Sequence, residues 1–299
     1  MIYDNWMSYI KDDVRLCSLV IPGSHNAGSY GMMKMAECQK DRLLTQFRYG
    51  VRQFCLRLDT DRKGKIVLAH GIAKGDSFEN VLCDIRTIIE HYPTEILLLD
   101  LREYYPSKIG PVTIKPKADK HKVDALLEKY ISPEKYAFCD FDKIGDVTVG
   151  DIRRAGKRYI IINPNEDYKF SRSCDCIFPW EKAVNGSHAK SFAAQTLRFF
   201  DDYSTDGLYW FQTQQTPNLG TEVGLTTPIK LDYELREYFK DIIKGIENNP
   251  AHLERANIIA GDFMTYDYMK SEAILRLNLL KNNVNNELAT EYAEGLKWN

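Results

Sequence analysis

The sequence predicts an α/β fold, an irregular (β/α)8 TIM barrel that forms one domain over residues 1–299. Two observations predict this fold. Short apolar runs recur along the chain, and several, such as ILLL and YIII, are apolar almost throughout, which is typical of strands covered on both faces. Helical periodicity follows most of these runs, and strands that alternate with helices favour a parallel sheet.

Eight strands are expected, at residues 15–21, 54–59, 66–70, 95–102, 158–163, 174–180, 209–215 and 257–263. Amphipathic helices are expected at 78–90, 122–130, 235–247 and 270–281, where apolar residues recur every three or four positions. The second and third strands are joined by too few residues for a full helix. We therefore expect the barrel to be irregular at that connection.

Composition excludes several classes of partner. The chain has 40 basic and 42 acidic residues, a net charge of −2, and no dense basic run, so we expect no nucleic-acid partner and only transient contact with a membrane surface. No transmembrane segment is expected, because no stretch approaches ~18 uninterrupted apolar residues. The first residues lack a signal-peptide pattern, which predicts a cytoplasmic protein as the sequence stands, or a secreted one if a signal was removed. Seven unpatterned cysteines fit reduced thiols.

Polar residues gather where the expected strands end. In (β/α)8 barrels, the carboxyl ends of the strands carry the chemistry. Glycines close to two histidines are expected to leave space for a ligand, and alternation places Cys55, Arg57 and Asp59 on one strand face. The expected rim consists of His25, Asn26, Arg57, Asp59, His70, Asp100, Arg102, Asn163, Trp180, Gln212, Gln214 and Asp262.

Each of these residues also has an ordinary structural interpretation. His25 could lie in a polar turn, His70 could be a satisfied core histidine, and Asp262 could cap a helix. The arginines could form ion pairs with Asp59 or Asp100, and Trp180 could pack in the core or stack on a sugar ring. Taken together, two histidines, arginine and carboxylates on one rim suit phosphodiester cleavage. One imidazole would take a proton from the attacking hydroxyl and the other would give one to the leaving oxygen, while a guanidinium stabilises the transition-state charge.

Seven motifs resemble the phosphatidylinositol-specific phospholipase C X-box superfamily, and they follow the family order over nearly the whole chain. The pattern is most similar to X-domain-only proteins and to the GPI-specific phospholipases C. The motifs are Trp6-Met7-Ser8, IPGSHNAGSY (21–30), GVRQFCLR (50–57), VLAHG (67–71), PTEILLLD (93–100), FQTQQTP (211–217) and NIIAGDF (257–263).

The resemblance implies a PLC-like phosphodiesterase that cleaves phosphatidylinositol, or a glycosylated relative, to diacylglycerol and a 1,2-cyclic inositol phosphate. It implies that His25 is the general base, His70 the general acid, Arg57 a phosphate ligand and Asp262 the residue that orients His25. The substrate would also meet Asn26, Asp59, Asp100, Arg102, Asn163, Trp180 and Gln212. Since Asp59 and Asp100 are the nearby acids, one of them is expected to support His70.

The resemblance also bears on metals. Calcium-dependent members have acids where this chain has Cys55, Arg57 and Arg102, and guanidinium groups repel a cation, so we expect no metal and no cofactor. Metal-independent bacterial members usually have acids at the positions of Asn26 and Cys55. These substitutions favour one alternative, a catalytically weak inositol-phospholipid-binding module. A second alternative is a metal-dependent glycerophosphodiesterase on the same barrel, against which the cationic Arg57 and Arg102 argue. The methionines of YGMMKM (30–35) are expected to contact lipid or to pack against the barrel.

Overall fold

Parallel strands form the centre of the computed structural model, in the order β10-β11-β1-β2-β5-β8-β9. The structure describes residues 2–103, 117–163, 168–177, 189–215, 227–266 and 268–296, and the backbone alone of 107–109 and 112–114. The parallel strands are β1 (Ile21–Ser24), β2 (Gln53–Thr60), β5 (Leu97–Arg102), β8 (Tyr159–Ile162), β9 (Ser171–Arg172), β10 (Trp210–Gln212) and β11 (Ile258–Gly261).

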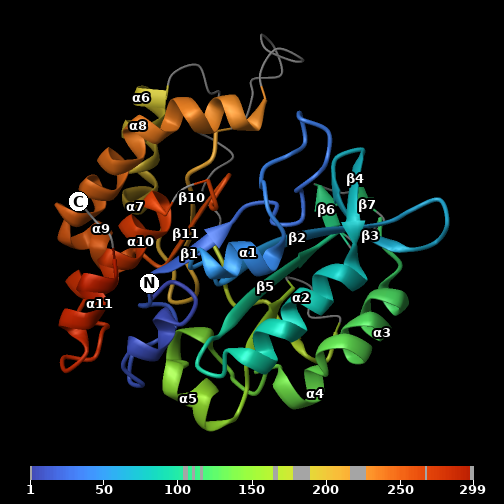
Figure 1. Cartoon of the computed structure of the whole chain (residues 1–299), viewed down its shortest axis with the longest axis horizontal. Helices are drawn as coiled ribbons and strands as arrows, with labels where there is room; N and C mark the ends of the chain where they lie inside the picture. The colour runs from blue at the N-terminus through green and yellow to red at the C-terminus, as the bar shows by residue number, and fades with distance from the viewer. Residues whose placement is uncertain are drawn as a thin grey trace.

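Two hairpins flank this sheet. The antiparallel strands β3 (Ile66–His70) and β4 (Ala73–Ser77) extend the end of β2, and β6 (Ser107–Ile109) pairs with β7 (Val112–Ile114). Figure 1 shows both hairpins on the same side of the molecule. The irregularity that we expected after the second strand is confirmed. The chain there makes a tight hairpin instead of a β–α–β crossover.

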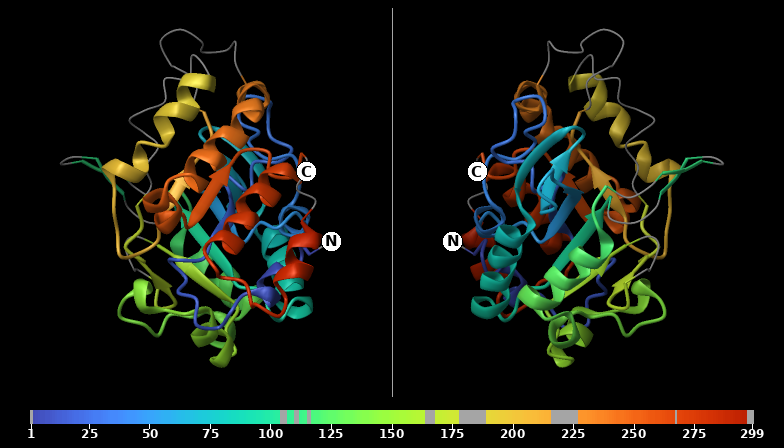
Figure 2. Two further views of the ribbon diagram at one scale, coloured as in Figure 1. Left: turned by 90° about the vertical axis from the view of Figure 1, so that its left-hand side faces the viewer. Right: turned by 90° about the vertical axis from the view of Figure 1, so that its right-hand side faces the viewer.

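Helices surround the sheet, as Figures 1 and 2 show. The 3-10 helices are η1 (Trp6–Tyr9) and η2 (Ile144–Asp146). The α-helices are α1 (Leu43–Arg48), α2 (Phe78–His91), α3 (Lys120–Ile131), α4 (Pro133–Tyr136), α5 (Val149–Arg154), α6 (Ala189–Thr196), α7 (Phe199–Asp202), α8 (Pro228–Glu247), α9 (Pro250–Arg255), α10 (Met269–Leu280) and α11 (Ala289–Gly295). In the described part of the chain, no helix is long and apolar enough to cross a bilayer.

Alternation along each strand divides the apolar side chains into two cores. Ile21, Leu98, Ile160 and Ala260 pack inside the curled sheet. Their neighbours in sequence pack outward under the helices, as Phe54, Leu99, Ile161 and Ile259 do. Strands with apolar side chains on both faces are the feature that the ILLL and YIII runs predicted. The predicted barrel-type α/β fold is thus confirmed, with the parallel strands forming a curled sheet.

A buried ion pair closes the base of the fold. The Arg52 guanidinium lies 2.6 Å from Glu95, and both side chains are 0% exposed. Arg52 also donates to the carbonyl oxygens of Phe47, Val51 and Tyr3, and it lies over the Phe47 ring. These bonds satisfy a charge that would otherwise be costly to bury. Arg52 and Glu95 come from the GVRQFCLR and PTEILLLD motifs, so part of the sequence signature is structural.

Two strand predictions were wrong. The first strand begins at Ile21, because residues 16–18 form a turn, and the apolar side chains of Leu16 and Leu19 pack in the inner core. The segment 174–180 is not a strand in its described part. Cys174 and Asp175 have positive φ angles of 59° and 43°, which are incompatible with extended backbone. Only an isolated bridge between Ile177 and Tyr209 remains there, while β9 pairs with β8.

Candidate active site

Strand register brings His25 and Asp262 together. In the parallel pair of β1 and β11, Ser24 lies opposite Gly261, so the residues that follow them leave the sheet side by side. Nδ1 of His25 lies 2.7 Å from Oδ1 of Asp262. Because a carboxylate only accepts, Nδ1 carries the proton, and the lone pair of the neutral ring is left on Nε2. The segment HNAG (25–28) thus forms a polar turn after β1, as its ordinary interpretation states, and it also presents an oriented imidazole.

His70 is oriented by the backbone. It ends β3, and its Nδ1 lies 2.9 Å from the carbonyl oxygen of Ala36. A carbonyl also only accepts, so this bond leaves Nε2 of His70 to gain or lose a proton. The expectation that the carboxylate of Asp59 or Asp100 orients His70 is wrong. Both carboxylates are engaged elsewhere, Asp59 with Lys74 and Asp100 with Arg102.

The two imidazoles lie across the same mouth. Their ring centroids are 6.5 Å apart and the ring planes are nearly perpendicular, at 83°. The side chain of His25 is 13% exposed and His70 is half-buried, so both rings reach the solvent side of the barrel mouth. Two imidazoles at this separation can both reach the oxygens of one phosphate bound at the mouth.

Burial and nearby charges shift the pKa of His25. Burial lowers its pKa below the usual histidine value, the carboxylate of Asp262 opposes that shift, and the positive charges of Arg57 and His70 add to it. Burial disfavours the charged imidazolium. His25 is therefore held as a neutral imidazole near neutral pH, the form that a general base requires.

Two arginines lie on adjacent strands. Arg57 of β2 is opposite Arg102 of β5, and Cys55 is opposite Asp100 in the same register. Nε of Arg102 lies 2.5 Å from Oδ2 of Asp100, an ion pair that agrees with its ordinary interpretation. Arg57 has only a loose contact of 3.8 Å with Glu103, and its buried Nε has no hydrogen-bond partner among the described residues. Arg57 is therefore available to an anion.

The remaining predicted residues differ in their surroundings. Asn26 is buried beside His25 with a left-handed φ of 43°, which asparagine tolerates. Gln212 ends β10, accepts a bond from Gln214, and leaves its buried amide nitrogen without a partner among the described residues. Asn163 is fully buried after β8. Trp180 lies outside the described residues. Space beside Gly28 is filled by Leu68, contrary to our expectation.

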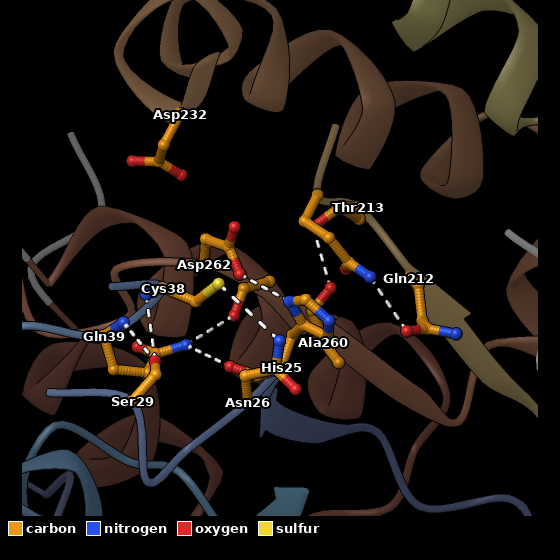
Figure 3. Close-up of polar contacts among 12 residues, drawn as sticks. His25, Asn26, Ser29, Cys38, Gln39, Gln212, Thr213, Asp232, Ala260 and Asp262 are labelled. Carbon is orange, nitrogen blue, oxygen red and sulfur yellow. Dashed lines mark hydrogen bonds and ion pairs between the residues drawn. The ribbon is translucent and has the colours of Figure 1, made fainter. Parts of the chain in front are cut away.

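Sequence reasoning missed several residues that hold the site together (Figure 3). Gln39 donates from Nε2 to the carbonyl oxygens of His25 and Gly261, which ties the ends of β1 and β11. Lys270 donates to the carbonyl oxygen of Asp262 and pairs with Asp232. No local motif marks these residues, because their roles depend on contacts far apart in the sequence.

Cys38 was also missed. Its sulfur lies 3.8 Å from Nδ1 of His70 and 3.7 Å from Nδ2 of Asn26. Figure 3 shows the thiol and Asp262 both beside His25. One ligand atom from each of His25, Cys38 and Asp262 lies within 4.8 Å of the others, so among the described residues these three could hold a metal ion.

One curated relative is similar to part of this chain in sequence. The 1-phosphatidylinositol phosphodiesterase of Staphylococcus aureus strain Newman is 30% identical over 110 residues, 35% of this chain and 35% of that protein. The aligned segment thus spans about a third of the curated relative. No protein-family profile matches the chain.

Similar folds extend over most of the molecule. Phosphatidylinositol-specific phospholipase C from Listeria monocytogenes superposes with a TM-score of 0.68 at 18% identity, over 92% of this chain and 98% of that one. The Staphylococcus aureus enzyme gives a TM-score of 0.63 at 18% identity, over 91% and 96% of the two chains. In fold along most of its length, and in sequence over about a third of it, the chain resembles the phosphatidylinositol-specific phospholipase C superfamily, as its motifs predicted.

Proposed function

We propose that this chain is a phosphodiesterase that cleaves an inositol phospholipid, either phosphatidylinositol or a glycosylated relative, by histidine acid–base catalysis. The observation that carries the proposal is the pair of imidazoles 6.5 Å apart, each oriented through Nδ1 and each with Nε2 available. The named relatives, a 1-phosphatidylinositol phosphodiesterase and phosphatidylinositol-specific phospholipases C, support the choice of substrate.

The reaction uses the Nε2 atoms of the two imidazoles, one as a base and the other as an acid. Nε2 of His25 takes the proton from the inositol 2-hydroxyl, whose oxygen attacks phosphorus. The bond between phosphorus and the glycerol oxygen breaks, and His70, which enters this step as an imidazolium protonated at both ring nitrogens, gives its Nε2 proton to that leaving oxygen and becomes neutral. The products are diacylglycerol and inositol 1,2-cyclic phosphate. Asp262 stabilises the imidazolium that forms at His25, as the carboxylate of a hydrolase triad does.

Arg57 stabilises the charge that develops on the phosphate. Its guanidinium lacks a close carboxylate partner among the described residues and lies near enough to lower the pKa of His25. A fixed cation in a site shielded from water can supply a large part of the rate enhancement. Arg102 is neutralised by Asp100 and lies on the neighbouring strand, so its role is to shape the pocket and to bind hydroxyl groups together with Gln212.

The reaction is proposed to be calcium-independent. Calcium binds six to eight oxygen ligands, usually with several carboxylates. At this mouth, the inward positions of β2 and β5 hold Cys55 and Arg57 next to Asp100 and Arg102, and Asp100 is already paired with Arg102. Two guanidinium groups in adjacent register disfavour a divalent cation between these strands.

An apolar rim formed by Met33, Met35 and Ile72 is proposed to contact the membrane. These side chains are 59%, 51% and 91% exposed. The methionines lie in the loop after β1, and Ile72 lies in the turn after His70. Tyr30 joins loop and hairpin by donating to Asp76, and Figure 1 shows the two side by side. Met32 of the same loop is buried against Gly75, so the loop both packs and presents apolar side chains.

A product analysis tests this proposal. Purified protein is incubated with phosphatidylinositol vesicles, with and without a calcium chelator, and the phosphorus products are followed by ³¹P NMR. We expect a five-membered cyclic phosphate to appear at the same rate in both samples. An acyclic phosphate as the first product, or a rate abolished by the chelator and restored by calcium, would contradict it. Vesicle binding without turnover would favour the alternative of a lipid-binding module, to which Asn26 and Cys55 point.

A further inference from the structure

The proposed reaction assigns no role to Cys38, although its thiol reaches both sides of the mouth. Its sulfur lies 3.8 Å from His70, and one ligand atom from each of Cys38, His25 and Asp262 lies within 4.8 Å of the other two. Packing does not account for this thiol. Cys55 and Cys174 belong to the inner apolar core, whereas Cys38 is part of neither core and is surrounded by polar groups.

We propose that Cys38, His25 and Asp262 form a site for a thiophilic divalent cation of the zinc class. Zinc binds thiolate, imidazole and carboxylate at roughly 2.0–2.3 Å, and three protein ligands leave a fourth position for water. In such a tetrahedron the ligand atoms are about 3.3–3.8 Å apart. The present separations, from 2.7 Å between His25 and Asp262 to at most 4.8 Å, are therefore within small side-chain rotations of that geometry.

The backbone already holds the three ligands. The N–H of Cys38 donates to Ser29, and its carbonyl oxygen accepts from Phe263, the residue after Asp262. Gln39 ties the carbonyl oxygen of His25 to that of Gly261. The ligands thus come from two segments that are cross-linked next to the site, and little ordering is needed when the ion binds.

Charge and proton balance are simple. The S–H bond of Cys38 breaks as the sulfur–metal bond forms, and the proton passes to solvent. Nδ1 of His25 binds the ion, and the proton that it carries toward Asp262 in the metal-free chain is released while solvent protonates Nε2, so the ring stays neutral. Thiolate, carboxylate and a dication sum to zero charge, which limits the cost of burying them. Because the thiol must lose its proton for the sulfur to bind the ion, binding should weaken as the pH falls.

A metal ion bound at this site would affect the phosphodiesterase reaction, and this consequence rests on the proposed function. An ion on His25 occupies the imidazole that is proposed to act as base, so the cation would inhibit the phosphodiesterase. This predicts inhibition by zinc and cadmium ions but not by magnesium or calcium, which prefer oxygen ligands.

Direct metal binding tests the site without reference to turnover. Cadmium is titrated into the wild-type chain, and thiolate-to-cadmium charge transfer is followed by ultraviolet absorption, while zinc affinity is measured by competition. The variants are Cys38→Ser, which removes the proposed thiolate, and Cys83→Ser, which removes a partly exposed thiol of α2. We expect a band that saturates at one equivalent in the wild type and in Cys83→Ser. In Cys38→Ser the band should be lost and zinc affinity should fall at least ~100-fold, since even outer-shell changes cost roughly 10–100-fold.

Two results would overturn the site. One is a wild-type chain without a saturable thiolate band, which does not depend on any variant folding. The other is zinc affinity in Cys38→Ser equal to that of Cys83→Ser. The outcome is separable from the proposed reaction. A chain that binds cadmium through Cys38 but turns over no phospholipid keeps the site and loses the function, and the reverse result keeps the function and loses the site.

Discussion

His25 and His70 lie nearly perpendicular, with ring centroids 6.5 Å apart, and each donates from Nδ1 to a fixed acceptor. The acceptors differ in charge. His25 faces the carboxylate of Asp262, whereas His70 faces the carbonyl oxygen of Ala36. An anion stabilises the imidazolium that a base becomes, and a neutral acceptor leaves an acid readier to lose its proton. The asymmetry supports His25 as base and His70 as acid.

Removing the carboxylate next to His25 should lower both the rate and the pKa of the base. Asp262 raises the pKa of His25 against the effect of burial, so Asp262→Asn should lower it further. We expect kcat to fall about 100-fold or more, as for other general-base systems. The acidic limb of the kcat/KM profile, which we expect below the usual histidine value in the wild type, should move to lower pH. A limb that moves to higher pH would contradict the assignment.

Replacing Arg57 should move the same limb in the opposite direction. Its positive charge lowers the pKa of His25, so Arg57→Gln should raise it, and activity should be lost at a higher pH as the solution is acidified. The rate should also fall by roughly 10²–10³, the usual cost of removing a group that stabilises transition-state charge. Steady-state kinetics across pH test both effects. A rate loss without a pH shift would mean that Arg57 lies farther from the base than we infer.

Breaking the buried pair at the base of the fold should affect stability. Glu95→Ala leaves Arg52 charged and unpaired in a dry site, which should cost about 3–5 kcal/mol of unfolding free energy. Arg154→Ala is the control, because Arg154 pairs with Asp151 on the surface and should cost less than ~1 kcal/mol. Urea unfolding measures both. Equal losses in the two variants would show that the buried pair does not stabilise the fold.

Polar substitutions in the apolar rim should weaken membrane contact selectively. The double variant Met33→Ser and Met35→Ser removes two exposed apolar side chains and should weaken binding to phosphatidylinositol vesicles about tenfold. Turnover of a short-chain, water-soluble substrate should be unchanged. Leu280→Ser, at the exposed end of α10, is the matched control. Vesicle sedimentation that gives the same affinity for all three proteins would remove the rim from the proposal.

Which side chains face the barrel interior could be predicted from the sequence where the side chains of a long strand alternate regularly between its two faces. Cys55 and Arg57 are examples, because alternation along β2 places both toward the barrel interior. Prediction from the sequence failed where apolar residues lie in turns. The run at 15–19 has the composition of a strand but packs as irregular backbone, and Cys174 has a left-handed φ that its neighbours do not reveal. Local patterns do not report which backbone conformation buries an apolar side chain.

In the candidate site, too, local sequence patterns identified residues at strand ends but not residues in irregular backbone. His25, Asp262 and His70 could be found because the first two directly follow strands that end at the mouth and His70 ends such a strand. Cys38 and Gln39 lie in irregular backbone, and bonds to Ser29, Phe263 and Gly261 place them at the mouth. Such contacts link positions far apart in sequence, so no periodicity or short motif could identify them in advance.

The most direct test of the central claim compares three histidine variants on phosphatidylinositol. His25→Ala and His70→Ala remove the proposed base and acid, and His91→Ala removes an exposed histidine at the end of α2. We predict that kcat/KM falls by at least ~10² in each of the first two and stays at the wild-type value in the third. A His25→Ala or His70→Ala variant as active as His91→Ala would contradict the account.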